Sequence, residues 1–141
     1  MNIRALVIDD SKIMRKMVMR SLTQTKLAEF EFDEAGDGVE GLEAFHPKKT
    51  DMIFVDWNMP NMTGIDFCRN LRTTQKRHVP IVMITTESTM GKIEEALDDV
   101  GVDSYVVKPF TPDKLKQKLE PLFEKLAESQ KGGFFSKLAS A

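Results

Sequence analysis

The chain has 141 residues, of which 41% are hydrophobic, enough for one compact domain with a buried core. Its 20 basic and 22 acidic residues are mixed along the chain and give a net charge of −2, which offers no general reason to expect binding to nucleic acid. Cys68 is the single cysteine, so an intramolecular disulfide is excluded and a reducing compartment is favoured. No apolar run resembles a signal peptide or approaches the ~20 residues of a membrane span. We therefore expect a cytoplasmic protein with no membrane function.

Short apolar segments alternate with helical patterns along the chain. Residues 5–8, 52–55 and 81–84 are continuous apolar runs, and residues 105–107 form a shorter one. Such runs are typical of strands in a parallel sheet that is covered on both faces. Residues 30–34 alternate phenylalanine with acids and predict a half-exposed strand at one edge.

Between these strands, apolar residues recur with the spacing of one helix face. The first helical stripe predicts Met14 and Met17 in the core and Met19 at the surface. The five predicted helical stripes cover residues 13–22, 39–45, 65–71, 93–100 and 115–126. The pattern is therefore α/β, a (βα)5 doubly wound fold with five parallel strands and helices on both faces of the sheet.

The last helix has a clear predicted start. Thr111 can cap it, with Pro112 at its first position and Asp113 next. Pro121 removes a backbone hydrogen bond and predicts a kink or a break. Residues 129–141 differ in character, and we expect a flexible tail after a domain of residues 1–128.

Polar residues follow the predicted strands. Asp9 and Asp10 follow the first strand and Asp56 the third, while Thr85 follows the fourth and Lys108 the fifth. The carboxyl ends of parallel strands share one edge of the sheet, where ligands bind in doubly wound folds. Three carboxylates at one place repel one another unless a cation joins them. Mg²⁺ takes oxygen ligands and often binds phosphate oxygens as well, so we expect Mg²⁺ at this edge.

Four segments resemble the receiver domains of bacterial response regulators. They are residues 7–15, 54–64, 84–87 and 104–110, in order and with the spacing of the family. The second of them is especially similar to single-domain chemotaxis regulators. The resemblance covers residues 3 to about 127 and implies the flavodoxin-like strand order 2-1-3-4-5.

The resemblance implies a role for each residue of the acidic edge. Asp56 would accept a phosphoryl group from a histidine kinase. Asp10, Asp56 and the backbone carbonyl of Asn58 would bind Mg²⁺, with Asp9 helping directly or through water. Lys108 would contact the phosphoryl group.

The resemblance also implies how the signal is read and ended. Thr85 would contact the phosphoryl group and form a switch pair with Tyr105, whose ring turns inward. Asn58 and Glu87 lie at positions that modulate dephosphorylation. The switch would act on the face made by the fourth helix, fifth strand and fifth helix.

The expected function is that of a monomeric signalling module without turnover of an external substrate. Its partners would be a histidine kinase, a flagellar motor switch or another protein target, and a phosphatase. The alternative is a phosphorelay intermediate or phosphate sink that passes the group to a histidine phosphotransfer protein. A dehalogenase-like phosphatase is less favoured, because Asn58 stands where those enzymes have a second acid. A flavodoxin is disfavoured, because Asp9 and Asp10 would repel a phosphate without a metal.

The tail carries three large apolar side chains, Phe134, Phe135 and Leu138, after two glycines. They could lie on one face of a short helix and dock on a partner or on the domain itself. The tail lacks the density of basic residues expected of a membrane-bound helix.

Overall fold

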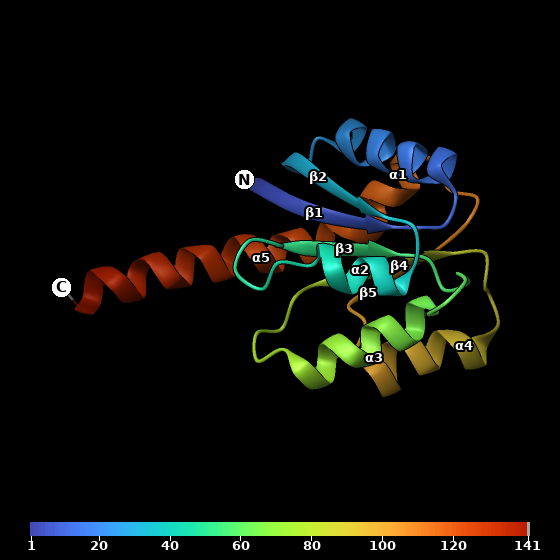
Figure 1. Ribbon diagram of the computed structural model, residues 1–141. Helices are drawn as coiled ribbons and strands as arrows, with labels where there is room; N and C mark the ends of the chain where they lie inside the picture. Colours follow the sequence, from blue (N-terminus) through green and yellow to red (C-terminus); the bar gives the residue numbers. More distant parts are fainter. Residues whose placement is uncertain (141) are drawn as a thin grey trace.

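The computed structural model describes the backbone of residues 1–140 and the side chains of residues 1–129. Its centre is one parallel sheet with the strand order β2-β1-β3-β4-β5, which confirms the predicted order (Figure 1). The five strands are β1 (Asn2–Ile8), β2 (Glu29–Ala35), β3 (Met52–Val55), β4 (Ile81–Thr85) and β5 (Ser104–Val107).

Helices cover both faces of the sheet. α1 and α5 pack on one face, and α2, α3 and the α4–η1 segment pack on the other (Figure 1). The helices are α1 (Lys12–Thr25), α2 (Gly38–Ala44), α3 (Gly64–Thr74), α4 (Met90–Glu94), the π-helical segment η1 (Glu95–Val100) and α5 (Pro112–Ser140). This arrangement confirms the (βα)5 doubly wound fold.

Two apolar cores form because successive strand residues point to opposite faces of the sheet. In β1, Leu6 and Ile8 enter the core under α2 and α3, whereas Ala5 and Val7 enter the core under α1 and α5. The central strand β3 is fully buried. Strands without a polar face are therefore required here, as the continuous apolar runs indicate.

Side-chain caps fix where several helices begin. Ser11 accepts a hydrogen bond from the amide of Met14 at 3.2 Å at the start of α1. Thr111 accepts one from the amide of Lys114 at 3.1 Å, and α5 begins at Pro112, as predicted. Each cap satisfies one of the amides that a helix leaves unpaired in its first turn.

The prediction for the core face of α1 was partly wrong. Val18 and Leu22 are buried, but Met17 is 55% exposed and Ile13 is 74% exposed. Met19, which was expected at the surface, is half-buried against the core of α1 and α5. The apolar residues of α1 cover more than one helix face, and only those in line with Val18 and Leu22 reach the sheet.

Of the kink or break predicted at Pro121, the break was wrong, because α5 continues through it. Leu119 and Phe123 are buried on either side of Pro121, so packing against the sheet holds the helix despite the missing hydrogen bond. The side chains of Phe134, Phe135 and Leu138 lie outside the described residues, and the division at residue 128 stays a prediction.

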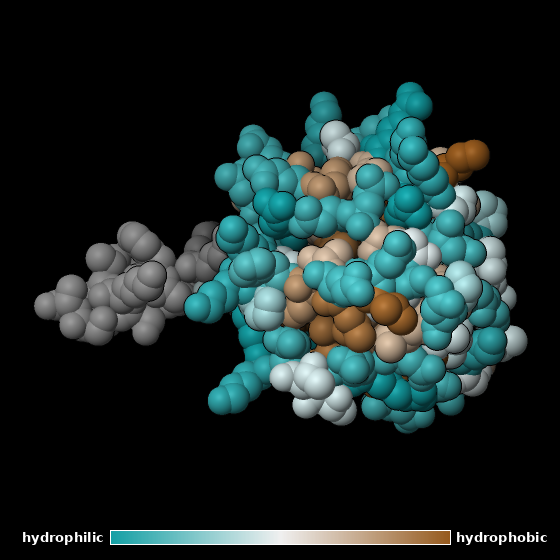
Figure 2. All heavy atoms as spheres, viewed as in Figure 1, coloured by the Kyte–Doolittle hydropathy of each residue, from teal (hydrophilic) through white to brown (hydrophobic). Residues whose placement is uncertain are grey.

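Figure 2 shows hydrophilic residues over most of one face, with apolar residues gathered in a patch near its centre. In the part of the chain that is described, no helix combines the length and the apolar content needed to cross a membrane.

Candidate functional site

Three carboxylates meet where β1 and β3 end. Asp9 directly follows β1, and its amide donates to the carbonyl of Ala35 at 3.1 Å. Asp56 directly follows β3, and its amide donates to the carbonyl of Ile8 at 3.0 Å. These bonds continue the strand pairing beyond the sheet and hold both aspartates at its edge. Asp9, Asp10 and Asp56 each place one carboxylate oxygen within 4.8 Å of the others.

Lys108 lies against two of these carboxylates. Its Nζ donates to Oδ2 of Asp9 at 2.8 Å and to Oδ2 of Asp56 at 3.0 Å. Burial by itself would lower the pKa of the Lys108 ammonium, but the hydrogen bonds and charges of Asp9 and Asp56 outweigh it and raise that pKa. The peptide bond from Lys108 to Pro109 is cis.

The donor set suits a hard divalent cation. Three carboxylates against one ammonium leave the cluster negative, and the oxygen atoms are close enough to share one ion. Asp9 is buried, Asp56 is half-buried and Asp10 is exposed, so the cluster opens to solvent on the side of Asp10. The residues present therefore fit Mg²⁺.

The segment after Asp56 turns back so that the start of α3 lies against the backbone of Asp56 and Trp57. The amide of Trp57 donates to Oδ1 of Asp56 at 2.6 Å, and the amide of Gly64 donates to the carbonyl of Trp57 at 2.8 Å. A Cβ atom at Gly64 would lie 1.7 Å from the carbonyl oxygen of Asp56. Only glycine permits this approach, so Gly64 lets α3 begin directly against the backbone of the aspartate.

Thr85 and Tyr105 are joined through Glu87. Thr85 is fully buried at the end of β4, and its hydroxyl accepts a hydrogen bond from the amide of Glu87 at 3.3 Å. Tyr105 lies inward with 5% of its surface exposed, and its hydroxyl donates to the carbonyl of Glu87 at 2.7 Å. Burial first, and then the charges of Glu87 and Asp56, raise the pKa of Tyr105 to about 12.

Glu87 also bridges to the loop after β3. Its carboxylate accepts a hydrogen bond from the side-chain amide of Asn58 at 2.6 Å and pairs with Lys92 at 3.1 Å. The Asn58 bond first, and then Lys92, hold the pKa of Glu87 below its ordinary value. The two residues predicted to modulate dephosphorylation are therefore in direct contact.

Comparison with known proteins decides the family. The sequence pattern of the response regulator receiver domain matches residues 5–120. The chain belongs to the response regulator receiver domain family. Response regulators are signalling proteins, in agreement with the coarse prediction of function.

Relatives of this receiver domain include chemotaxis proteins. The CheY protein of Pseudomonas aeruginosa is 40% identical over 127 residues, which cover 87% of this chain and 98% of that protein. CheY-3 of Vibrio cholerae is 40% identical over 126 residues, covering 89% and 95% of the two chains.

Solved structures of relatives have the same fold. CheY4 of Vibrio cholerae superposes with a TM-score of 0.74 at 35% identity and covers 86% of this chain and 98% of its own. CheY of Borrelia burgdorferi, solved as a CheX-CheY-BeF3-Mg complex, superposes with a TM-score of 0.78 at 25% identity. The match covers 86% of this receiver domain and 89% of that chain.

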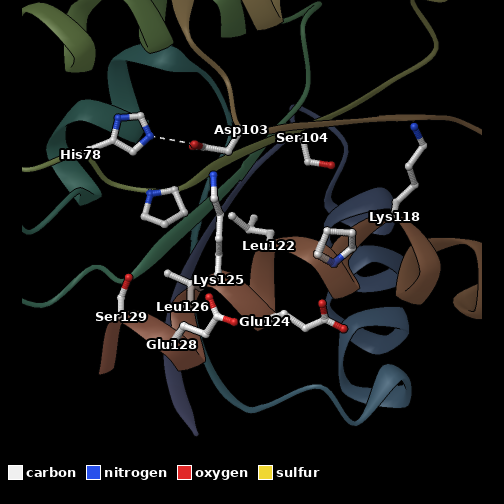
Figure 3. A pocket seen from close by; sticks show the side chains of 12 residues that line it. His78, Asp103, Ser104, Lys118, Leu122, Glu124, Lys125, Leu126, Glu128 and Ser129 are labelled. Carbon is white, nitrogen blue, oxygen red and sulfur yellow. Dashed lines mark hydrogen bonds and ion pairs between the residues drawn. The ribbon is translucent and has the colours of Figure 1, made fainter. Parts of the chain in front are cut away.

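Two large grooves of the receiver domain have none of the three carboxylates in their lining. One of about 670 Å³ lies at the amino ends of β4 and β5, between α5 and the contact of His78 Nε2 with Oδ1 of Asp103 at 2.7 Å (Figure 3). This is the opposite end of the sheet from the acidic cluster. A second groove of about 660 Å³ runs along β5 between Ile93 on α4 and Lys114 on α5. The second groove lies on the face where the sequence predicts that partners dock.

Sequence patterns did not reveal every residue that shapes this site. Arg15 donates from Nη1 to the carbonyl of Asp9 at 2.7 Å and pairs through Nε with Glu34 at 3.0 Å. Asp37 accepts a hydrogen bond from the side chain of Asn61, in the loop after β3, at 2.7 Å. The only signal for Asp37 in the sequence is that of a helix cap, with Glu40 three residues on.

Proposed function

We propose that this receiver domain is a single-domain chemotaxis regulator that is phosphorylated on Asp56 with Mg²⁺ and thereby changes its affinity for a protein partner. The observation that carries the proposal is the convergence of Asp9, Asp10 and Asp56 on the Lys108 ammonium at one edge of the sheet. This chain matches relatives named as chemotaxis proteins over nearly their whole length, which supports chemotaxis as the pathway that it serves.

The chemistry follows from the groups around Asp56. A carboxylate oxygen of Asp56 attacks the phosphorus of a phosphohistidine on the kinase, and the P–N bond breaks with its electron pair going to the imidazole nitrogen. Lys108, already bonded to Asp56, contacts the transferred oxygens and offsets their charge. Asp10, Asp56 and the carbonyl of Asn58 would hold Mg²⁺, with Asp9 adjacent. Bound there, Mg²⁺ supplies the further positive charge that phosphoryl transfer requires.

A phosphoryl group on Asp56 would offer an acceptor toward which the hydroxyl of Thr85 could turn and donate. That hydroxyl now accepts from the Glu87 amide, and the Glu87 carbonyl in turn holds the Tyr105 hydroxyl. Turning Thr85 toward the phosphoryl group would release the Glu87 amide and shift the segment that leads into α4. The groove along β5 borders on Tyr105, so its shape would change with this switch.

The partners follow the same reasoning. A histidine kinase would donate the phosphoryl group, and a flagellar motor switch protein is the favoured target. The Borrelia relative was solved with BeF3, Mg and the protein CheX, which supports Mg²⁺ as the cofactor and a CheX-like or phosphatase partner for this chain.

We also propose that the tail residues Phe134, Phe135 and Leu138 dock on a partner, on the basis of the sequence alone. Deletion of residues 131–141 should lower partner affinity, and unchanged affinity would reject that role.

The test of the central proposal is phosphorylation by acetyl phosphate with Mg²⁺, read by mass spectrometry. The wild-type chain should gain one phosphoryl group, Asp56→Asn should gain none, and a matched change at an exposed aspartate, Asp99→Asn, should behave as wild type. If wild type gains no phosphoryl group, or Asp56→Asn gains as much, the proposal fails. Binding of the phosphorylated chain to a motor switch protein, compared with a histidine phosphotransfer protein, then separates chemotaxis output from a phosphate sink.

A further inference from the structure

The loop between β3 and α3, residues 56–63, is hydrogen-bonded to the start of α2. The amide of Gly38 donates to the carbonyl of Met62 at 3.2 Å. The side-chain amide of Asn61 donates to Oδ2 of Asp37 at 2.7 Å. Residues more than twenty positions apart are thus joined by one backbone and one side-chain hydrogen bond.

The two carboxylate oxygens of Asp37 accept hydrogen bonds from different elements. Oδ1 accepts from the amide of Glu40 at 2.8 Å and caps α2, while Oδ2 accepts from Asn61. Asp37 as a whole residue is 8% exposed. The bond from Glu40 first, and then the bond from Asn61, hold the pKa of Asp37 below its ordinary value, so the carboxylate stays charged and both bonds are charge-assisted.

The contact constrains the loop backbone closely. Asn61 has a φ of 66°, in the left-handed region that few residues other than glycine and asparagine adopt. A Cβ atom at Gly38 would lie 2.8 Å from the carbonyl oxygen of Met62, so only glycine allows α2 to come this near. A conformation of this kind persists where the surrounding contacts determine it, and here Asp37 supplies one of them.

We propose that Asp37 is a positioning residue for the phosphorylation site. Through Asn61 it fixes the loop that carries Asn58, and so sets the backbone carbonyl that would complete the Mg²⁺ ligands. Asp37 acts at a distance, since it is not a member of the carboxylate cluster found among the described residues. The proposal rests on the proposed function, because it assigns the loop a part in holding that metal.

Two substitutions remove the link while keeping each local conformation. Asp37→Ser keeps a good helix cap but is too short to reach Asn61. Asn61→Gly accommodates the positive φ and removes only the side-chain amide. Asp37→Asn is the matched control, because it keeps the cap oxygen and can still bond to Asn61 once that amide turns over.

Three measurements distinguish a role of Asp37 in positioning the loop from a role in the stability of the fold alone. Mg²⁺ affinity is measured by the fluorescence of Trp57, the only tryptophan, whose amide bonds to Asp56. Hydrogen exchange of the backbone amides of residues 57–59 and 61–63 is measured without metal, and urea unfolding gives the stability of each variant.

Asp37→Ser and Asn61→Gly should each weaken Mg²⁺ binding about three- to tenfold, somewhat less than the loss of a group that directly orients a metal ligand. The double variant should be no worse than either single one, because both break the same bond. The loop amides should exchange faster in each single variant, whereas Asp37→Asn should match wild type in Mg²⁺ affinity and in exchange.

Unchanged Mg²⁺ affinity and exchange in Asp37→Ser and Asn61→Gly would overturn the proposal, whatever happens to stability, and leave Asp37 as a helix cap only. Wild-type protein that binds no Mg²⁺ would overturn the proposed function as well. Faster loop exchange in that case would show that the link is purely structural.

Discussion

The ammonium of Lys108 lies between two carboxylates that come from different strands. Its side chain is 9% exposed, and that of Asp9 is 5% exposed. At such a site a charge left without its partner is costly, whereas the paired charges are tolerated. Lys108 therefore balances the acidic cluster when no metal is bound.

Lys108→Met should destabilise the protein most when Mg²⁺ is absent. Without metal, Asp9 and Asp56 lose their partner, and the free energy of unfolding should fall by on the order of 3 kcal/mol. With Mg²⁺ the metal supplies positive charge to the same carboxylates, so the loss should be smaller. Urea unfolding with EDTA and with Mg²⁺ measures both, and the exposed Lys114→Met is the control. An equal loss in the two conditions would contradict this account.

Tyr105 should titrate well above the ordinary pKa of a tyrosine. Burial, Glu87 and Asp56 raise its pKa to about 12, and the ultraviolet absorbance is unambiguous because it is the only tyrosine. The unfolded chain should ionise near 10, so the folded state holds its proton longer and stability is lost as the pH rises from about 10 to about 12. The chain in urea is the control. A folded-state midpoint near 10 would show that the hydroxyl is exposed to water.

At the level of elements, strands were easier to predict than helix faces. A buried parallel strand needs apolar residues at every position, so the runs in β3 and β4 mark both the strand and its end. A helix buries only part of its circumference. Met17 of α1 is apolar and yet exposed, because the neighbouring elements, and not its own sequence, decide which side of the helix is covered.

Two glycines near α4 should respond in opposite ways to alanine. A Cβ at Gly91, within α4, would meet nothing within 4 Å, so Gly91→Ala should stabilise the protein by about 0.5–1 kcal/mol through helix propensity. Gly101 follows η1 with a φ of 84°, so Gly101→Ala should lower the free energy of unfolding of the protein by about 1–2 kcal/mol. Urea unfolding of both variants measures the pair. Loss of stability in Gly91→Ala would mean that α4 requires the freedom of glycine.

For the whole molecule, the sequence predicted which residues share an edge but not how they pair. The order of the strands brings Asp9, Asp56 and Lys108 to one end of the sheet, which strand patterns can anticipate. The ion pair of Lys108 with Asp9 joins residues 99 positions apart and depends on the directions of individual side chains. The bond between Asp37 and Asn61 depends on the shape of two loops, for which no periodic pattern exists.

Because the carboxylates come from the ends of β1 and β3, a cation held by them should stabilise the whole fold. A ligand that binds only the folded state adds about 2.7 kcal/mol to the free energy of unfolding when its concentration is 100 times its dissociation constant. Mg²⁺ at such a concentration should give a gain close to this value. Asp10→Asn removes one charge from the exposed side of the cluster and should reduce the gain at the same Mg²⁺ concentration.

Urea unfolding across a Mg²⁺ titration measures the effect, with NaCl of equal ionic strength as the control for screening. A gain no larger than that from NaCl would mean that the acids only repel one another and hold no ion. An equal gain in wild type and Asp10→Asn would place the ion elsewhere. A gain specific to Mg²⁺ and reduced in Asp10→Asn would tie the stability of the whole sheet to the site that Asp56 occupies.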